Sequence, residues 1–202
     1  MKVLLINGSP HKNGCTFTAL SEIAMQLGKN RIESEIFHIG SAPIGGCTAC
    51  GACFKDRGKC VLGDTDGVNT CIEKIDAADG VIIGSPVYFA SINGNLGSLL
   101  DRVFFAKASF AGKPAAGIVS CRRGGSGSAF DRLNKYFTIS AMPVVSSQYW
   151  NGVHGNTPEQ IKQDIEGLQV MRVLANNMAW LLKCLEAGKS AGIEFPTPEK
   201  RV

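Results

Sequence analysis

The stretch KVLLINGSPHKNGCTFTAL, residues 2–20, decides how the rest of the chain is interpreted. Residues 2–7 form a short apolar run that ends at Gly8, which is typical of a buried strand. From residue 16 to residue 28 the apolar side chains recur at helical spacing, and Gly28 ends the pattern. The intervening loop therefore follows a strand and opens a helix, where backbone N–H groups and the helix dipole favour an anion.

The same alternation continues along the chain. Further strands are predicted at residues 32–39, 80–84, 113–121 and 143–149. Further helices are predicted at residues 68–78, 93–106, 126–137 and 158–186, the last with a possible interruption near Gly167. Apolar strands that alternate with amphipathic helices indicate an α/β fold of three layers. We expect a flavodoxin-like, doubly wound, five-stranded parallel sheet, in which ligands bind at the carboxyl ends of the strands.

Length and composition are those of one ordinary globular domain. The chain has 202 residues, of which 45% are hydrophobic and 19% charged, so disorder is not expected. We expect a single domain over residues 1–202, with a cysteine-rich loop at 40–66 and a C-terminal helix at 158–186. A net charge of +4 gives no reason to expect nucleic-acid binding. No apolar run is long enough for a membrane helix or a signal peptide, which predicts a cytoplasmic protein without a membrane partner.

Four of the eight cysteines lie within fourteen residues, in the run GGCTACGACFKDRGKC. The ligand candidates are Cys47, Cys50, Cys53 and Cys60, spaced C-x2-C-x2-C-x6-C. Four closely spaced thiolates suit a [4Fe-4S] cluster, provided that Cys60 folds back toward the other three. Two alternatives remain open: metal-free cysteines, reduced or joined as disulfides, and a zinc site, for which this spacing is cramped. Cys15, Cys71, Cys121 and Cys184 are expected to be small buried hydrophobic residues.

Three loops follow predicted strands and carry the candidate cofactor site. The loop at residues 8–16 is rich in neutral hydrogen-bond donors, which suits a monophosphate such as that of FMN; a plain turn with a capping hydroxyl is the alternative. The loop at 84–94 is unexpectedly aromatic, and a flat ring system stacked on residues 86–89 would explain this; ordinary core packing is the alternative. The loop at 121–128 contains two arginines and several glycines. The arginines could bind a phosphate or a carbonyl of the cofactor, and a simple turn with solvated arginines is the alternative.

The candidate cofactor-binding residues are Ser9, His11, Asn13, Cys15, Thr16, Phe17, Thr18, Pro86, Val87, Tyr88, Phe89, Ser91, Arg122, Gly124 and Gly125. No side chain is expected to act as a catalytic acid or base, because the sequence offers none with a clear partner. Trp150 and His154 are expected at the mouth of the cofactor site or at an interface.

The segments GSPHKNGCTFT (8–18) and GSPVYFASINGNLGSLLDR (84–102) resemble the NADPH-dependent FMN reductases of the flavodoxin superfamily. The cysteine run is similar to that of the iron–sulfur flavoproteins. The resemblance implies one FMN per subunit, a four-iron cluster on the cysteine loop, and a homodimer or homotetramer. It also implies that the chemistry takes place at flavin N5, with NAD(P)H as hydride donor.

Two functions follow from this resemblance. One is an FMN-dependent oxidoreductase that passes electrons from NAD(P)H to a small-molecule or protein acceptor. The other is an iron–sulfur flavoprotein electron carrier, reduced by a ferredoxin-like partner without direct NAD(P)H activity. Lys55, Arg57 and Lys59 beside the cysteines would then dock an acidic carrier, unless they form only a solvated loop tip.

Overall fold

The computed structural model describes residues 1–55, 57–62, 65–107, 109–197 and 199. Its central sheet holds the parallel strands β1 (Lys2–Asn7), β2 (Glu33–His38), β3 (Gly80–Tyr88), β5 (Ala115–Cys121) and β6 (Gly152–His154), in the order β2-β1-β3-β5-β6. A two-residue strand, β4 (Ser91–Ile92), pairs antiparallel with the end of β3. Without β4 this is the flavodoxin-like order, so the predicted fold is confirmed.

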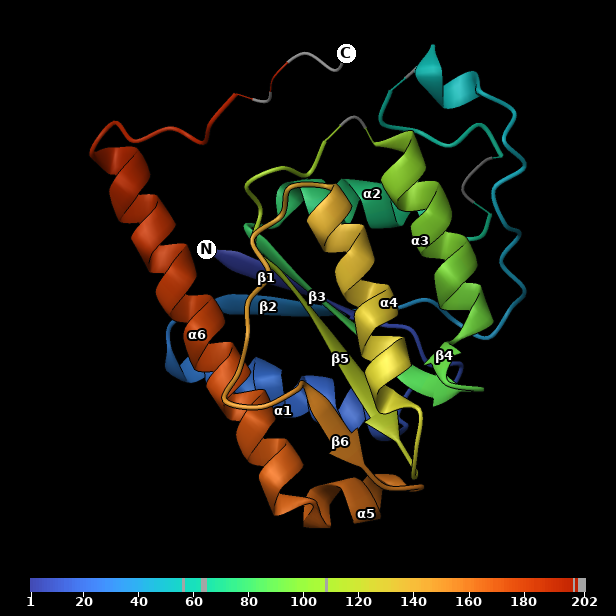
Figure 1. Cartoon of the computed structure of the whole chain (residues 1–202), viewed down its shortest axis with the longest axis vertical. Helices are drawn as coiled ribbons and strands as arrows, with labels where there is room; N and C mark the ends of the chain where they lie inside the picture. The colour runs from blue at the N-terminus through green and yellow to red at the C-terminus, as the bar shows by residue number, and fades with distance from the viewer. Residues whose placement is uncertain (56, 63–64, 108, 198, 200–202) are drawn as a thin grey trace.

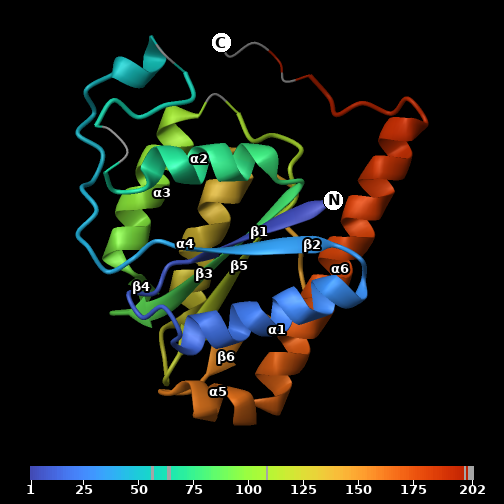
Figure 2. The same cartoon turned by 180° about the vertical axis from the view of Figure 1, so that it is seen from behind.

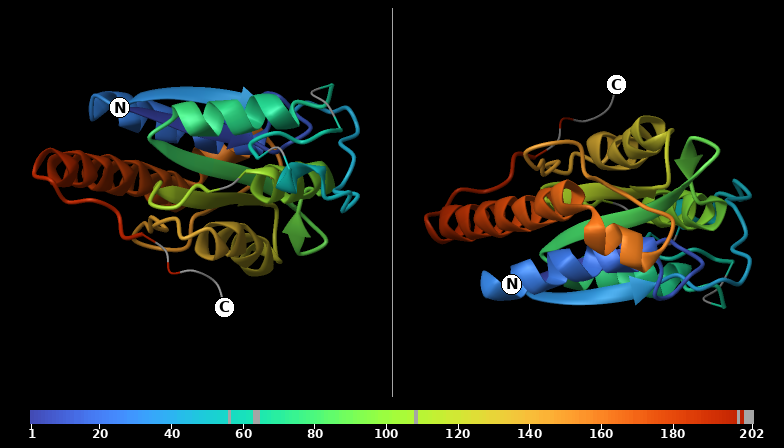
Figure 3. Two further views of the ribbon diagram at one scale, coloured as in Figure 1. Left: turned by 90° about the horizontal axis from the view of Figure 1, so that it is seen from above. Right: turned by 90° about the horizontal axis from the view of Figure 1, so that it is seen from below.

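Helices cover both faces of the sheet, as Figures 1 and 2 show from opposite sides and Figure 3 shows from above and from below. The helices are α1 (Cys15–Lys29), α2 (Val68–Ala77), α3 (Gly94–Ala106), α4 (Ser126–Ile139), α5 (Pro158–Gln163) and α6 (Ile165–Ser190), with a short 3-10 helix η1 (Ala52–Phe54). No helix in the described part of the chain has the length and apolar character needed to cross a membrane.

The two sides of each strand pack into separate cores. Leu4 and Ile6 face a core formed with α2, α3 and α4, whereas Val3 and Leu5 face a core formed with α1, α5 and α6. Since successive side chains of a strand point to opposite faces, continuous apolar runs such as VLLI are what a sheet buried on both faces requires.

The fifth parallel strand does not lie where the sequence predicts it. In the predicted strand at 143–149 a single bridge, Val144 with Ala115, joins the sheet, and β6 follows at Gly152–His154. The chain leaves the sheet after Val145 and rejoins it at the buried residue Asn151. Its Nδ2 donates to Gly117 O at 3.0 Å, while Val119 N–H donates to Asn151 O at 2.9 Å. The position predicted for this strand is therefore wrong by about one strand length.

Two other boundaries differ from the prediction. The strand predicted at 80–84 continues to Tyr88 and forms a hairpin with β4, so most of the expected loop at 84–94 is regular structure. The helix predicted at 158–186, with an interruption near Gly167, consists of α5 and α6, and the interruption lies at Asp164. Asp164 Oδ1 caps α6 by accepting from Gly167 N–H at 3.0 Å. The predicted loop at 40–66 and the C-terminal tail lie partly outside the described residues.

Candidate functional site

A hollow of about 220 Å³ lies where the carboxyl ends of β1, β3 and β5 meet. It is lined by Ser9, His11, Cys15, Thr16, Pro86, Val87, Tyr88, Ser120, Arg122, Gly155 and Asn156. The β1/β3 pair marks the point where the chain switches from one half of the sheet to the other, which is the usual ligand position in this fold.

The first loop presents the amino end of α1 to this hollow. The N-cap is Gly14, which has no side chain to satisfy the first-turn N–H groups, and no acidic residue lies in the first turn. These N–H groups have no partner within the helix and are therefore available to an anion. The loop itself is fixed internally: Ser9 N–H donates to Asn7 Oδ1 and His11 N–H donates to Ser9 Oγ, both at 3.1 Å.

Buried polar contacts hold the loops in register. The hydroxyls of Thr16 and Ser120 hydrogen-bond at 2.8 Å and join the start of α1 to the end of β5. At Gly84, on β3, a Cβ would lie 2.8 Å from Thr16 Cγ2, so only glycine permits this approach. Burial raises the pKa of the Cys15 thiol, which therefore stays neutral at the edge of the hollow.

The second loop is a two-residue turn between β3 and β4. Phe89 and Ala90 both have positive φ, 49° and 57°, as in the type I′ hairpin turn that normally selects Asn and Gly. Left-handed backbone costs a non-glycine residue about 1–2 kcal/mol. The turn holds the side chain of Phe89 fully exposed, at 107% of its reference area. Strained backbone that displays an aromatic ring beside a hollow is typical of a ligand site.

The structure brings part of the predicted set together. Eight predicted residues line the hollow: Ser9, His11, Cys15, Thr16, Pro86, Val87, Tyr88 and Arg122. Seven do not line it: Asn13, Phe17, Thr18, Phe89, Ser91, Gly124 and Gly125. The Thr18 hydroxyl instead donates a hydrogen bond to Gly14 O at 3.1 Å. A cofactor-binding role for each of the fifteen stays a prediction.

Sequence reasoning missed three residues of the lining. Ser120 lies inside a strand that the apolar pattern correctly marks as buried, and its position next to the third loop is the one available signal. Gly155 and Asn156 follow β6, the strand whose position the sequence does not reveal. Trp150 and His154 line a different hollow of about 190 Å³, between β6, α4 and the start of α6.

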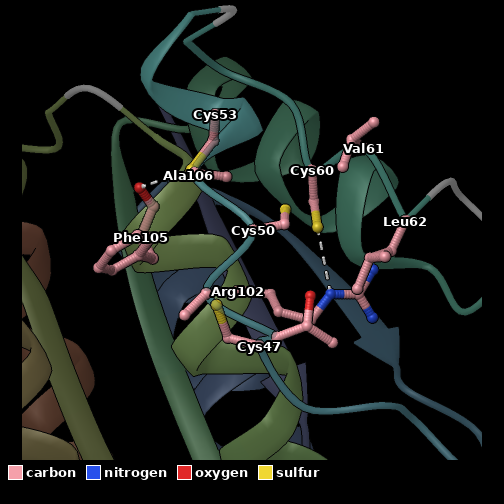
Figure 4. Close-up of a pocket in the computed structure, with 12 residues that line it drawn as sticks. Cys47, Cys50, Cys53, Cys60, Val61, Leu62, Arg102, Phe105 and Ala106 are labelled. Carbon is pink, nitrogen blue, oxygen red and sulfur yellow. Dashed lines mark hydrogen bonds between the residues drawn. The ribbon is translucent and has the colours of Figure 1, made fainter.

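The four clustered cysteines line one pocket, on the cysteine loop where it runs along α3 (Figure 4). Cys47 and Cys50 are exposed, while Cys53 and Cys60 are half-buried against α3. The side chain of Asn69 fixes the backbone of Cys60 on both sides, accepting from its N–H at 2.7 Å and donating to its O at 3.2 Å. Cys60 thus lines the same pocket as the other three, and its role as a ligand stays a prediction.

Arg102 of α3 reaches the same pocket from below. Its Nε–H donates to Cys60 Sγ at 3.3 Å, and its Nη1 donates to Gly45 O at 3.1 Å and to the carboxylate of Asp66. Burial alone would lower the pKa of this guanidinium, but the hydrogen bonds to Asp66 and Cys60 outweigh it and raise the pKa. Arg102 is thus a permanent buried cation beside a thiol.

The donor set fits an iron–sulfur cluster in its chemistry. All four side chains are thiols, and a cation lies within hydrogen-bond distance of one of them. The space between them is about 20 Å³, enough for roughly one water, so the loop must open to admit a cluster. Within the described ranges no group of three or more His, Cys, Asp or Glu side chains is placed to hold a metal ion, so neither a cluster nor a zinc ion finds a preformed set of ligands.

Of the remaining cysteines, two match the expected burial and two do not. Cys71 and Cys121 are buried, and burial raises the pKa of Cys71 to about 12. Cys15 is half-buried and Cys184 is exposed on α6, so the expectation that these are buried hydrophobic residues is wrong.

Comparison with known proteins gives a family match over most of the chain. The model of the NADPH-dependent FMN reductase family matches residues 1–157. An iron-sulfur flavoprotein of Methanocaldococcus jannaschii is 30% identical over 197 residues, which are 92% of this chain and 100% of that protein.

Solved structures show the same fold at low sequence identity. RosB, solved with a bound 8-demethyl-8-formylriboflavin-5'-phosphate, has a TM-score of 0.73 and 14% identity over 100% of this chain and 91% of its own. A flavodoxin from the domain Archaea has a TM-score of 0.61 and 12% identity over 91% of this chain and 99% of its own.

Proposed function

The chain belongs to the NADPH-dependent FMN reductase family, among the iron–sulfur flavoproteins, and we propose that it binds FMN in the hollow at the carboxyl ends of β1, β3 and β5. It then acts as an FMN oxidoreductase that takes electrons from NAD(P)H and delivers them to a small-molecule or protein acceptor.

One observation carries the proposal: loops far apart in the sequence converge on one hollow with complementary chemistry. The uncapped amino end of α1 suits the phosphate, and Ser9 and Thr16 hold this end in place. Pro86, Val87 and Tyr88 offer an apolar wall for a flat ring. A hollow of about 220 Å³ is smaller than a typical cofactor site, so part of the ring would lie at the mouth, beside the exposed Phe89.

Bound FMN would supply the redox chemistry by accepting hydride at N5 and releasing electrons to the acceptor. The residues of the chain bind the FMN and orient it. Arg122 stands at the mouth of the hollow, exposed, with its guanidinium free to meet a phosphate or a ring carbonyl.

The direct test is titration of the cofactor-free protein with FMN and with riboflavin, followed by flavin fluorescence. We expect one FMN per chain, and at least tenfold weaker binding of riboflavin because it lacks the phosphate. Equal affinity for both flavins would show that the amino end of α1 does not bind the phosphate. Absence of FMN binding would overturn the proposal.

Two neighbouring arginines provide a matched pair for the same titration. Arg122 lines the hollow and Arg123, equally exposed, does not. Arg122→Gln should weaken FMN binding about tenfold, the loss of roughly one charge-assisted hydrogen bond. Arg123→Gln should leave the affinity for FMN unchanged.

A second function is favoured by the four thiols on one pocket: an electron carrier with FMN and a [4Fe-4S] cluster, reduced by a ferredoxin-like protein. The visible spectrum of protein purified without oxygen, recorded before and after NADPH, separates the two functions. Flavin bleaching by NADPH supports the oxidoreductase. A broad iron–sulfur absorption, with no flavin bleaching until a ferredoxin-like reductant is added, supports the carrier.

A further inference from the structure

Arg102 is the largest fully buried side chain of the protein's described part, with its side chain 1% exposed. A buried charge is costly unless it is paired and hydrogen-bonded. Two of its nitrogens contact three widely spaced points of the cysteine loop, namely Gly45, Cys60 and Asp66. Nη2 has no hydrogen-bond partner among the described residues. Placing this charged side chain beside the cysteines therefore costs free energy of folding.

We propose that Arg102 is a positioning residue for the cysteine pocket: its Nε–H holds the sulfur of Cys60 toward the other three cysteines, and its charge sets how readily a cluster bound there is reduced. This inference rests on the proposed cluster function and goes beyond it, because it assigns a role to a residue outside the four thiols.

The hydrogen-bond geometry supports the positioning role. Nε is the guanidinium nitrogen nearest to the helix, so its N–H direction is fixed once Nη1 is held by Gly45 and Asp66. In Figure 4 this N–H reaches Cys60 from the side of α3, while the guanidinium carbon and Nη atoms lie farther from the cysteines. A lysine keeps the charge but cannot hold the loop and the sulfur together.

The charges of Arg102 and Asp66 should shift the reduction potential of a bound cluster in opposite directions. The reduced form of a cluster carries one more negative charge than the oxidised form, and its potential depends on nearby charge and on hydrogen bonds to its sulfurs. Arg102 favours the reduced form. Asp66, its ion-pair partner with a side chain 17% exposed, opposes that effect. Removing Arg102 should therefore lower the reduction potential, and removing the charge of Asp66 should raise it.

The test compares Arg102→Met, Arg102→Lys and Asp66→Asn in the full chain, purified and reconstituted without oxygen. Iron and acid-labile sulfide per chain report the positioning role, and a spectroscopic redox titration reports the potential. Arg102→Met should lose at least half of the iron. In its loaded fraction the oxidised-to-reduced ratio should shift at least tenfold at fixed potential, about 59 mV for one electron, toward the oxidised form. Asp66→Asn should shift the ratio in the opposite direction. Arg102→Lys should lose iron as Arg102→Met does, because lysine cannot hold the loop and the sulfur together, but its loaded fraction should keep the wild-type ratio because the charge remains.

Arg132→Met is the matched control, because Arg132 lies on α4, is about half exposed and contacts Tyr136 and Asp101 instead of the cysteine loop. It should leave iron content and potential unchanged. Shifts of the same sign in Arg102→Met and Asp66→Asn would point to loosened packing alone and overturn the inference. A wild-type chain that holds no iron after reconstitution would overturn the cluster function itself, and the inference with it.

Discussion

At the scale of single residues, the candidate FMN site depends on a contact between two backbones. Gly125, the N-cap of α4, has a φ of 90°, and a Cβ added there would lie 2.8 Å from Ala90 Cα. Ala90 in turn belongs to the strained turn that displays Phe89. The glycine therefore locks the third loop against the second.

Replacement of Gly125 by alanine should destabilise the protein by about 2 kcal/mol, for two reasons. Alanine is strained at this positive φ, and its Cβ would collide with the backbone of Ala90, which cannot move away easily. Urea denaturation measures this loss, and it should be accompanied by weaker FMN binding. Gly127→Ala is the control: that glycine lies within α4 with no atom near its missing Cβ, so stability should be kept or slightly raised. Equal stability of the two variants would contradict the backbone contact.

At the scale of secondary-structure elements, ion pairs join β2, at the edge of the sheet, to its neighbour β1 and to helix α2. Glu35 of β2 lies between Lys2 of β1, at 2.7 Å, and Lys74 of α2. Hydrogen bonds from Lys2 and Lys74 hold the pKa of Glu35 below its ordinary value of 4.5. A lowered carboxyl pKa contributes stability above the ordinary value, and this contribution disappears as the pH falls through the lowered pKa.

Glu35→Gln should therefore be less stable than the wild type at pH 7, by about 0.5–1 kcal/mol for two partly exposed pairs. The difference should shrink below pH 4.5 and disappear once Glu35 is protonated in the folded protein. Denaturant titrations at several pH values test this. Glu73→Gln on α2, an exposed residue in no ion pair of the described residues, should show no such pH-dependent loss. A difference that persists at low pH would assign the effect to something other than charge.

Elements with strong apolar periodicity could be predicted from the sequence. Elements whose position depends on a single side-chain hydrogen bond could not. The strand and helix that flank the loop at 8–16 follow from local pattern, and the alternation of strands and helices along the chain indicates the doubly wound fold. The position of β6 does not, because it depends on Asn151, whose side chain bonds to Gly117 in place of the main chain. The boundary between α5 and α6 likewise depends on one acceptor, Asp164.

The candidate site shows the same division. Convergence of three loops on one edge follows from parallel topology, so most of the hollow's lining could be named in advance. Arg102 could not, because its spacing from Cys60 in the sequence says nothing about a hydrogen bond formed only when α3 packs under the loop. Ser120 is a similar case, since its hydroxyl meets Thr16 across 104 positions.

At the scale of the whole molecule, the two candidate sites lie toward different ends of α3. The amino end of α3 follows β4, near the FMN hollow, whereas η1 and the outer part of the cysteine loop lie near its carboxyl end (Figures 1 and 2). Aromatic contacts hold that outer part: Phe54 packs edge-on against Phe105 at 5.4 Å, and the Arg57 guanidinium lies over the Phe54 ring at 4.8 Å. An electron carrier that serves the cysteines would meet this part of the surface.

Three exposed cations, Lys55, Arg57 and Lys59, mark the same surface. Changing all three to Glu should slow reduction by an acidic ferredoxin-like carrier at least tenfold at low salt, because opposite charge accelerates encounter. The effect should fade as salt shortens the Debye length to about 8 Å near 0.15 M. Stopped-flow reduction at several salt concentrations measures it. Changing Lys162, Lys183 and Lys189 to Glu alters net charge equally but on α5 and α6, so it should leave the rate almost unchanged. Equal slowing in both triple variants would mean that net charge, and not this surface, guides the carrier, and the docking surface would have to be sought elsewhere.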